Sequence, residues 1–223
     1  LTINRTPQFS WLNASDPEND TVTYNLLIAN NTNFTNPIVN QLNINLTTYS
    51  LTLAQELPVD TVVYWRVRAF DGLTFGNFSG YRNITVESFI SLSLPIKIVD
   101  FGALDSGHSK NTTTNDPPPL LVQNDGNIFV DVQINASDLW NSISNPNEFY
   151  QYKIRENESG SFDTFLSTML FTNMPTTAAI VDIARLKHYG TSDNAYTDLK
   201  ITAPTDEPAG AKISTITFTA QPS

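Results

Sequence analysis

The stretch TVVYWRVRAF, residues 61–70, carries the pattern that decides the fold of its surroundings. Its odd positions, from Val63 to Ala69, are all apolar. Its even positions include Arg66 and Arg68, so apolar and charged side chains alternate with the period of a β-strand. β-branched and aromatic residues, which favour strands, fill most of the run. The pattern predicts a strand with one buried face and one solvent-exposed face.

Similar runs recur along the chain, and turn-forming residues separate them at intervals of about 8 to 12 positions. These runs are TVTYNLLIA (21–29), YSLTLA (49–54), NIFVDVQI (127–134), TDLKITA (197–203) and STITFTA (214–220). Helical periodicity is scarce. The chain is therefore predicted to be all-β, with a turn spacing typical of β-sandwiches.

Local signals add detail at three places. QNDGN (123–127) stands between two apolar runs, and its Asp-Gly pair supplies the positive φ of a tight turn, so a hairpin is expected there. ASDLWNSI (136–143) predicts a turn of helix capped by Ser137 or Asp138. FDTFLSTML (162–170) is ambiguous between helix and strand.

Composition excludes several classes of protein. The 223 residues include 12 basic and 22 acidic ones, for a net charge of −10, and the basic residues are scattered rather than clustered as a nucleic-acid surface requires. Cysteine is absent, which removes disulfides and thiolate metal sites. Apolar runs such as FISLSLPIKIV (89–99) are too short to span a bilayer. The chain starts at Leu1 and shows no signal peptide, which predicts a processed mature protein or part of a longer one.

N-glycosylation sequons are more than twice as frequent as the roughly five that random placement of these residues would give. The eleven acceptors are Asn4, Asn13, Asn19, Asn30, Asn33, Asn45, Asn77, Asn83, Asn111, Asn135 and Asn157. Four of them (Asn33, Asn45, Asn77 and Asn83) also fit an amphipathic strand with Asn and Ser or Thr on its outer face. Such a strand has the sequence pattern of a sequon whether or not a glycan is attached. The remaining seven favour N-linked glycans, and hence an extracellular or cell-surface location.

The first part of the chain resembles a fibronectin type III domain of prokaryotic surface proteins. The stretches that carry the resemblance are TPQFSWLNASDPENDTVTYNLLI (6–28), YSLTLAQELPVDTVVYWRVRAFDG (49–72) and GYRNITV (80–86). The resemblance implies that Trp11 is the core tryptophan of the second strand and Tyr24 its partner on the third. It departs at Val63, which stands where the family has its corner tyrosine, and in the thin first strand, LTIN. A sandwich without a full first strand exposes an edge that another chain can pair with.

The second part looks like another immunoglobulin-like sandwich of archaeal or bacterial cell-surface proteins. VDFGALDSGHS (99–109) has its Gly-rich turn, and LKITAPTDEPAGAKISTITFTA (199–220) resembles its closing hairpin. A boundary is predicted near residues 87–91, which gives units 1–88 and 89–223, because most sequons precede it and a Pro-rich loop follows it. The resemblance implies a location and a scaffold role rather than a chemistry.

Catalytic constellations are weak in this sequence. His108 and His188 are the only histidines, and DSGHS brings Ser106 and Ser109 close to His108 without a nucleophile elbow, so a surface turn is the better interpretation. Glycosidase chemistry needs two facing carboxylates, which a chain with 22 acids always offers somewhere and which therefore supports no such assignment. No enzyme activity and no cofactor are expected.

Calcium is the best chemical candidate. SDPEND places Asp16, Glu18 and Asp20 at alternate positions, and Asp71 in a second turn is expected at the same end of the sandwich; hard oxygen donors of this kind suit Ca²⁺. The alternative is that these residues only make turns. Carbohydrate binding at Trp140, beside a sequon, is weighed against simple packing, which accounts better for a large aromatic side chain.

Three functions remain open. The first is a non-enzymatic structural subunit of an extracellular, N-glycosylated filament, sheath or surface layer, of archaeal type given sequons without cysteine. Its copies would assemble into a homopolymer by β-strand addition, with LTINRTP (1–7) as donor or the vacant edge as acceptor. The second is an adhesin or spacer segment of a larger surface protein, binding through its second sandwich. The third is a pair of accessory domains of a secreted hydrolase.

Overall fold

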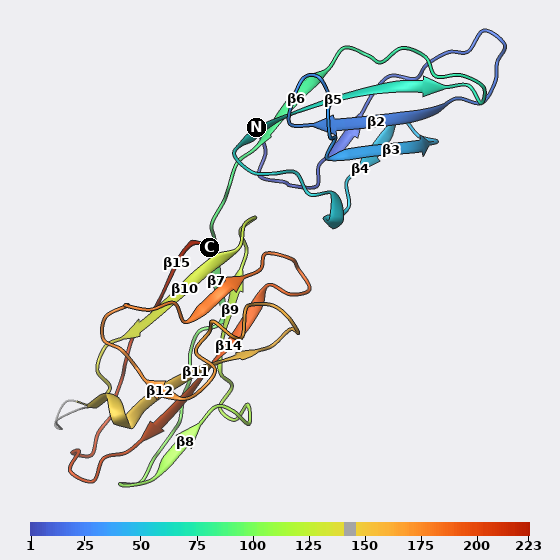
Figure 1. Cartoon of the computed structure of the whole chain (residues 1–223). Coiled ribbons are helices and arrows are strands. Elements are labelled where there is room, and N and C mark those ends of the chain that lie inside the picture. Colours follow the sequence, from blue (N-terminus) through green and yellow to red (C-terminus); the bar gives the residue numbers. More distant parts are fainter. Residues whose placement is uncertain (141–145) are drawn as a thin grey trace. The chain divides into compact units, whose positions relative to one another are not determined.

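The computed structural model describes residues 1–140 and 146–223, and the chain divides into two compact units, Leu1–Ser88 and Phe89–Ser223 (Figure 1). Strands dominate both units, with two short 3-10 helices between them. The predicted all-β class is confirmed. In each unit a hydrophobic core lies between two antiparallel sheets, which makes each a β-sandwich.

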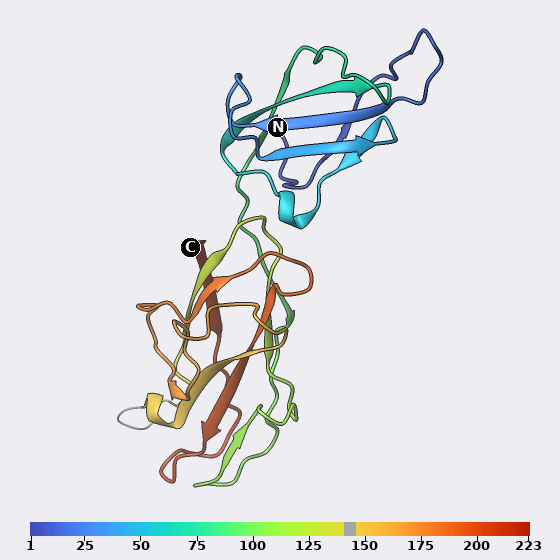
Figure 2. The ribbon, with the colours of Figure 1, turned by 45° about the vertical axis from the view of Figure 1, so that its right-hand side comes forward.

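The first unit has a four-stranded sheet and a two-stranded sheet. The larger has the order β3-β2-β5-β6, with strands Val39–Ile44, Thr23–Ala29, Thr61–Phe70 and Arg82–Val86 (Figure 2). The smaller pairs β1 (Gln8–Ser10) with β4 (Thr48–Ser50), and a 3-10 helix, Leu53–Gln55, follows. The strand expected over 61–70 is confirmed residue for residue. The run 49–54 is strand only at its start, because Thr52 and Gln55 form a capping box that turns the chain.

The core of the first unit forms as the alternation predicts, except that a different aromatic residue lies at its centre. Phe9 on β1 is the buried aromatic side chain and packs edge-on against Trp65, with ring centroids 5.1 Å apart. Trp11 lies just beyond β1 and is half-buried, with its ring 5.5 Å from that of Tyr24. The predicted Trp11–Tyr24 contact is therefore present, but Phe9 occupies the centre that was expected for Trp11.

The even face of β5 is covered, although the sequence predicts that it is solvent-exposed. Loop residues fold over it, so that the Arg66 guanidinium lies 4.1 Å from the Phe34 ring and 4.0 Å from the Phe78 ring. Arg68 lies 3.8 Å from Phe75 and 4.5 Å from Phe78. Stacking of guanidinium groups on aromatic faces lets a charged face be covered. We call these five residues the arginine–aromatic cluster.

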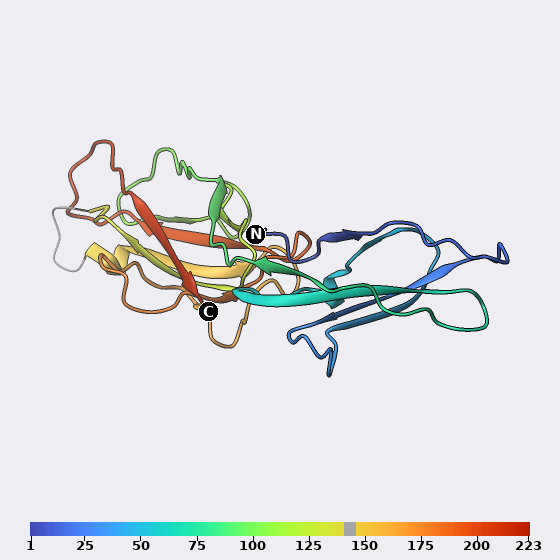
Figure 3. The ribbon, with the colours of Figure 1, turned by 90° about the horizontal axis from the view of Figure 1, so that it is seen from above.

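The second unit has a large and a small sheet (Figure 3). The large sheet has the order β12-β11-β14-β9-β7, with strands Thr172–Asn173, Tyr150–Glu156, Asn194–Thr202, Leu120–Asn124 and Leu92–Ile96. A sixth strand, β8 (Ser109–Asn111), also pairs with β14. The small sheet has the order β13-β10-β15, with strands Ile183–Leu186, Val130–Ala136 and Ile216–Pro222. A 3-10 helix, Pro146–Phe149, precedes β11.

Two predicted hairpins are wrong. The turn at 123–127 carries the chain from β9 in the large sheet to β10 in the small one, and the segment 203–215 likewise joins β14 to β15 across the sandwich. Gly126 is required there by crowding rather than by positive φ, because a Cβ at this position would lie 2.4 Å from the Phe89 carbonyl oxygen.

The helix expected over 136–143 is also not found. Ala136 ends β10 and residues 137–140 are not helical; the rest of that prediction lies outside the described residues. Residues 162–170 form turns with a single isolated bridge at Asp163. Asx-type turns there outcompete both helix and strand, since Asp163 Oδ1 accepts a bond from the Phe165 amide at 3.1 Å.

Candidate functional site

The carboxylates of Asp16 and Asp71, which were expected to bind calcium, accept hydrogen bonds from residues of their own turns. Asp16 Oδ1 accepts bonds from the amides of Glu18 and Asp20 at 3.0 and 2.9 Å. Asp71 accepts the Thr74 amide at 2.7 Å and its hydroxyl at 3.1 Å, and the amide bond lowers the Asp71 pKa. Among residues 1–140 and 146–223, no group of three or more acidic or histidine side chains is placed to hold a metal ion. A calcium site stays a prediction.

Most sequon asparagines lie at the surface. Nine are exposed: Asn4, Asn13, Asn19, Asn30, Asn33, Asn45, Asn77, Asn83 and Asn157. Asn111 and Asn135 are half-buried, and the Asn135 amide donates to the Thr176 carbonyl at 3.3 Å. The Asn157 amide donates to Asn194 Oδ1 at 2.8 Å. Because a glycan is attached at this amide nitrogen, these last two acceptors would have to give up a bond.

The sequon at Asn77 has a structural explanation of its own. Ser79 exchanges two bonds with Val67: the Ser79 amide donates to the Val67 carbonyl at 2.7 Å, and the Val67 amide donates to the Ser79 hydroxyl at 3.1 Å. Phe78 belongs to the arginine–aromatic cluster. Both residues after Asn77 are thus required by the fold, whether or not a glycan is present.

The residues weighed for hydrolysis and sugar binding have structural roles. The exposed His108 ring contacts the Ser106 carbonyl at 3.2 Å, and the Ser109 hydroxyl pairs with Thr202 Oγ1 at 2.7 Å, so the imidazole activates neither hydroxyl. Trp140 is only 6% exposed, and its indole donates to the Phe149 carbonyl at 3.2 Å. Packing, rather than an exposed sugar platform, accounts for this tryptophan.

The second unit has an apolar cleft between segments 97–104 and 207–216. Its volume is about 980 Å³. Trp140, Tyr150 and Ile201, which belong to the buried core, line its floor. Burial raises the pKa of Tyr150 to about 12. Ile98 and Ile213 line the walls, and they remain 74% and 84% exposed.

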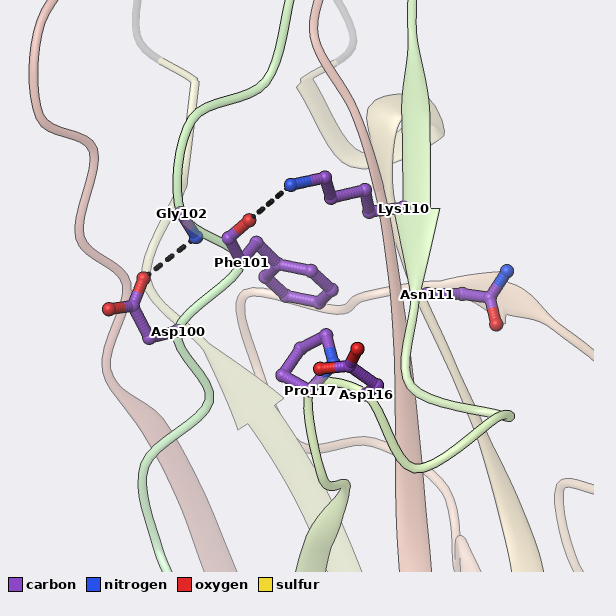
Figure 4. Close-up of a pocket in the computed structure, with 7 residues that line it drawn as sticks. All are labelled: Asp100, Phe101, Gly102, Lys110, Asn111, Asp116 and Pro117. Atoms are coloured by element: carbon purple, nitrogen blue, oxygen red, sulfur yellow. Dashed lines mark hydrogen bonds between the residues drawn. The ribbon is translucent and has the colours of Figure 1, made fainter.

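Side-chain bonds fix one wall of the cleft. Lys110 on β8 donates to the carbonyls of Phe101 and Ala103 at 2.7 and 2.9 Å, and Asp100 Oδ1 accepts the Gly102 amide at 2.8 Å (Figure 4). The same residues border a smaller hollow of about 380 Å³. Gly102 has a φ of +61°, which the tight bend after Asp100 requires.

The opposite wall is fixed in the same way. Lys212 forms an ion pair with Glu207. The Ser214 hydroxyl donates to the Ser137 carbonyl at 2.6 Å, and the Thr215 amide donates to the Ser137 hydroxyl at 2.9 Å. Because both walls have their own bonds, the cleft is preformed and does not need an occupant to hold it open.

The edge strand beside this wall, β15, has an unpaired side. Its odd residues exchange backbone bonds with β10, as the bonds from the Ser223 amide to Phe129 and from the Ser137 amide to Thr215 show. The backbone groups of Ile216, Phe218 and Ala220 therefore point away from β10. In the described part of the chain no strand pairs with that side. The seven residues ITFTAQP carry no charge. This edge therefore lacks the charged side chains that usually keep an exposed strand from pairing with another chain.

The thin first strand of the first unit is attached to its own unit. Thr2 forms a parallel bridge with Val86: its amide donates to the Thr85 carbonyl at 3.2 Å, and the Glu87 amide donates to the Thr2 carbonyl at 2.8 Å. β1 pairs only with β4, so its other edge is vacant, as the missing strand predicts. That edge is three residues long, which offers a partner much less than β15 does.

Comparisons with known proteins leave the family open. No protein-family model matches the chain, and no curated protein matches it. Among solved structures it is similar to the chicken CNTN1 FN1–FN3 domains, at 14% identity over 97% of this chain and 64% of that one, with a TM-score of 0.31. It is also similar to an α-L-rhamnosidase from Dictyoglumus thermophilum, at 12% identity over 99% of this chain and 26% of that one, with a TM-score of 0.29.

At such TM-scores neither likeness bears on function, and the class of the protein rests on its own sheets: an all-β chain of two sandwich units. No described helix has the length and apolar character needed to cross a membrane.

Proposed function

We propose that the chain is a non-enzymatic structural subunit of an extracellular, N-glycosylated filament, sheath or surface layer, and that its copies join by β-strand addition. The observation that carries the proposal is the unpaired, uncharged side of β15 next to a preformed apolar cleft. A strand added there gains backbone bonds along the edge and apolar contacts in the cleft, the two components of this mode of recognition.

The surface sequons support the extracellular part of the proposal. Nine of the eleven acceptors are exposed, and eight of the eleven lie in the first unit. Glycans on that unit would shield it, while the cleft lies in the second unit, where acceptors are few. Polar, glycosylated surface on one unit and an apolar docking site on the other suit a subunit that must pack in one defined way.

Sedimentation velocity of the purified chain over a wide concentration range, with negative-stain electron microscopy of native material, tests the proposal. Concentration-dependent association and regular filaments or lattices are expected. Monomers at every concentration, with isolated particles in the native material, would reject self-assembly and favour the spacer or adhesin function.

Mass spectrometry of glycopeptides tests the glycan component separately. We expect occupancy at several of the nine exposed asparagines and none at Asn135, where the amide is bonded within the fold. Unmodified peptides throughout would remove the glycoprotein from the proposal without affecting the strand-addition component.

A further inference from the structure

Residues Leu1–Asn4 have the features of a strand that lacks a place for its side chains. Thr2 lies in an extended bridge to β6, yet the flanking Leu1 and Ile3 side chains are 90% and 53% exposed. Apolar side chains two residues apart on an extended segment lie on the same side of it. The chain bends at Ile3 in the isolated copy, so the segment would have to straighten to dock as a strand. Among the described large apolar residues, no other pair two positions apart has both members more than half exposed.

The cleft offers the complementary feature. From Ala211 to Ala220 exposed and half-buried residues alternate, and the last five of these ten residues belong to β15, which begins at Ile216. Its free backbone groups recur at every second residue, at Ile216, Phe218 and Ala220. The cleft reaches this edge at Ile216, so an extended segment that pairs with the start of β15 brings its apolar side chains to the cleft, near the exposed Ile98 and Ile213.

We infer that the segment Leu1–Asn4 of one copy docks along β15 of a second copy, with its Leu1 and Ile3 side chains in the apolar cleft. The inference rests on the proposed function and names its donor and acceptor. The side chains of Leu-Thr-Ile-Asn carry no charge and alternate apolar with polar, which matches the uncharged side chains of β15 and an apolar cleft. A donor with a charged residue at position 1 or 3 would bury that charge unpaired.

Exchange of this strand replaces bonds of one kind with bonds of the same kind. Leaving β6 breaks the bonds of the Thr2 amide and carbonyl, and pairing with β15 forms backbone bonds in their place. The remainder of the segment stays anchored, because the Arg5 guanidinium pairs with Glu56 at 3.3 Å and donates to the Leu57 carbonyl at 3.0 Å. The net gain is the burial of Leu1, Ile3, Ile98 and Ile213, which are all exposed in the isolated chain.

Each docking joins two different surfaces, so the contact is heterologous. A copy that donates at one unit still has a vacant cleft at its other unit, and chains of copies can therefore grow without closing. This geometry is what a filament or sheath requires. A symmetric dimer through two β15 edges would instead stop at two copies.

Paired variants of the full chain test the inference by sedimentation velocity. Leu1→Asn with Ile3→Asn disables the donor, and Ile98→Asp with Ile213→Asp disables the acceptor; all four side chains are exposed, so folding is retained. Leu12→Asn with Leu53→Asn, 93% and 63% exposed in the same unit as the donor, is the matched control. We expect each disabled variant to lose at least about tenfold in association constant, and the control to behave as wild type.

Mixing the two disabled variants gives the decisive result. One keeps its cleft and the other keeps its donor, so the mixture should form one-to-one dimers that do not grow, although each variant alone is monomeric. If wild type associates and the donor variant associates equally, or if the mixture stays monomeric, the named donor and acceptor are wrong while self-assembly stands. If wild type itself is monomeric at every concentration, the inference and the proposed function both fail.

Discussion

Removing the Asp182 carboxylate should strongly destabilise the second unit. Asp182 is fully buried and accepts bonds from the Ile134 amide at 2.7 Å, the Thr168 hydroxyl at 3.1 Å and the Tyr152 hydroxyl. Ile134 lies on β10 of the small sheet and Tyr152 on β11 of the large one, so the carboxylate ties the two sheets together. Burial raises its pKa, and the three donors oppose that shift.

The magnitude follows from the groups that Asp182→Ala leaves behind. The Ile134 amide and the Tyr152 hydroxyl, both buried, lose their acceptor, and each such orphan costs about 1–3 kcal/mol. The free energy of unfolding should therefore fall by about 2–6 kcal/mol, against a typical domain stability of about 5–15 kcal/mol. Tyr152→Phe removes one donor and leaves the other two, so it should cost only about 1–2 kcal/mol.

Urea unfolding monitored by tryptophan fluorescence measures both values. Trp140 is the only tryptophan after residue 88, so Trp11→Phe with Trp65→Phe makes the signal specific for the second unit. Thr164→Ala, at an exposed site whose side chain makes no hydrogen bond within the described residues, is the control and should change nothing. A loss below about 1 kcal/mol for Asp182→Ala would refute the reasoning, because buried donors cannot lose a charged acceptor so cheaply.

Three further outcomes are expected. Phe78→Ala removes two arginine contacts and should destabilise the first unit by about 2–3 kcal/mol in urea unfolding followed through Trp11 and Trp65, with Trp140 replaced by Phe, whereas Leu12→Ala, at a side chain 93% exposed in the same unit, should not; equal effects would contradict the cluster's role. The pKa of Tyr150 rises from 10.0 to about 12 on folding, so its stabilising contribution is fully present below pH 10 and is lost as pH rises to about 12. The free energy of unfolding should fall by up to roughly 2.7 kcal/mol over this range because of Tyr150. Tyr150→Phe should not show this part of the loss of stability at alkaline pH in unfolding curves. Gly126→Ala should cost about 2 kcal/mol or more by thermal unfolding, because the new Cβ meets the Phe89 carbonyl; a neutral result would show that the turn gives way freely.

The sequence predicts the strands of this protein better than it predicts their partners. Alternation over 61–70 is a local property, and the strand there begins and ends where the pattern does. An Asp-Gly turn, in contrast, looks the same whether the strands on either side of it pair or cross to opposite sheets. Only long-range contacts, such as the crowding of Gly126 by Phe89, decide that β9 and β10 separate.

The same reason explains the misjudged face of β5. Arg66 and Arg68 predict a solvent-exposed face when read alone, because the aromatic residues that cover them come from distant loops. The cleft could not be predicted at all, since it consists of an unoccupied place beside β15 rather than of any motif. The vacant edge that LTIN did predict is present at β1, but it is shorter than the edge of the second unit.

If copies dock by strand addition as proposed, the open cleft with fixed walls links association to the stability of the second unit. Its floor residues Trp140, Tyr150 and Ile201 are buried without an occupant, and its rim residues Ile98 and Ile213 are exposed. A strand that binds only the folded unit stabilises it in proportion to the logarithm of its concentration. Crowded copies would therefore hold their second units more firmly than dilute ones, whereas a first unit that donates Leu1–Asn4 gives up the bonds of Thr2 to β6. This exchange would suit the proposed subunit, which has to stay folded as a monomer and gains stability once neighbouring copies are present.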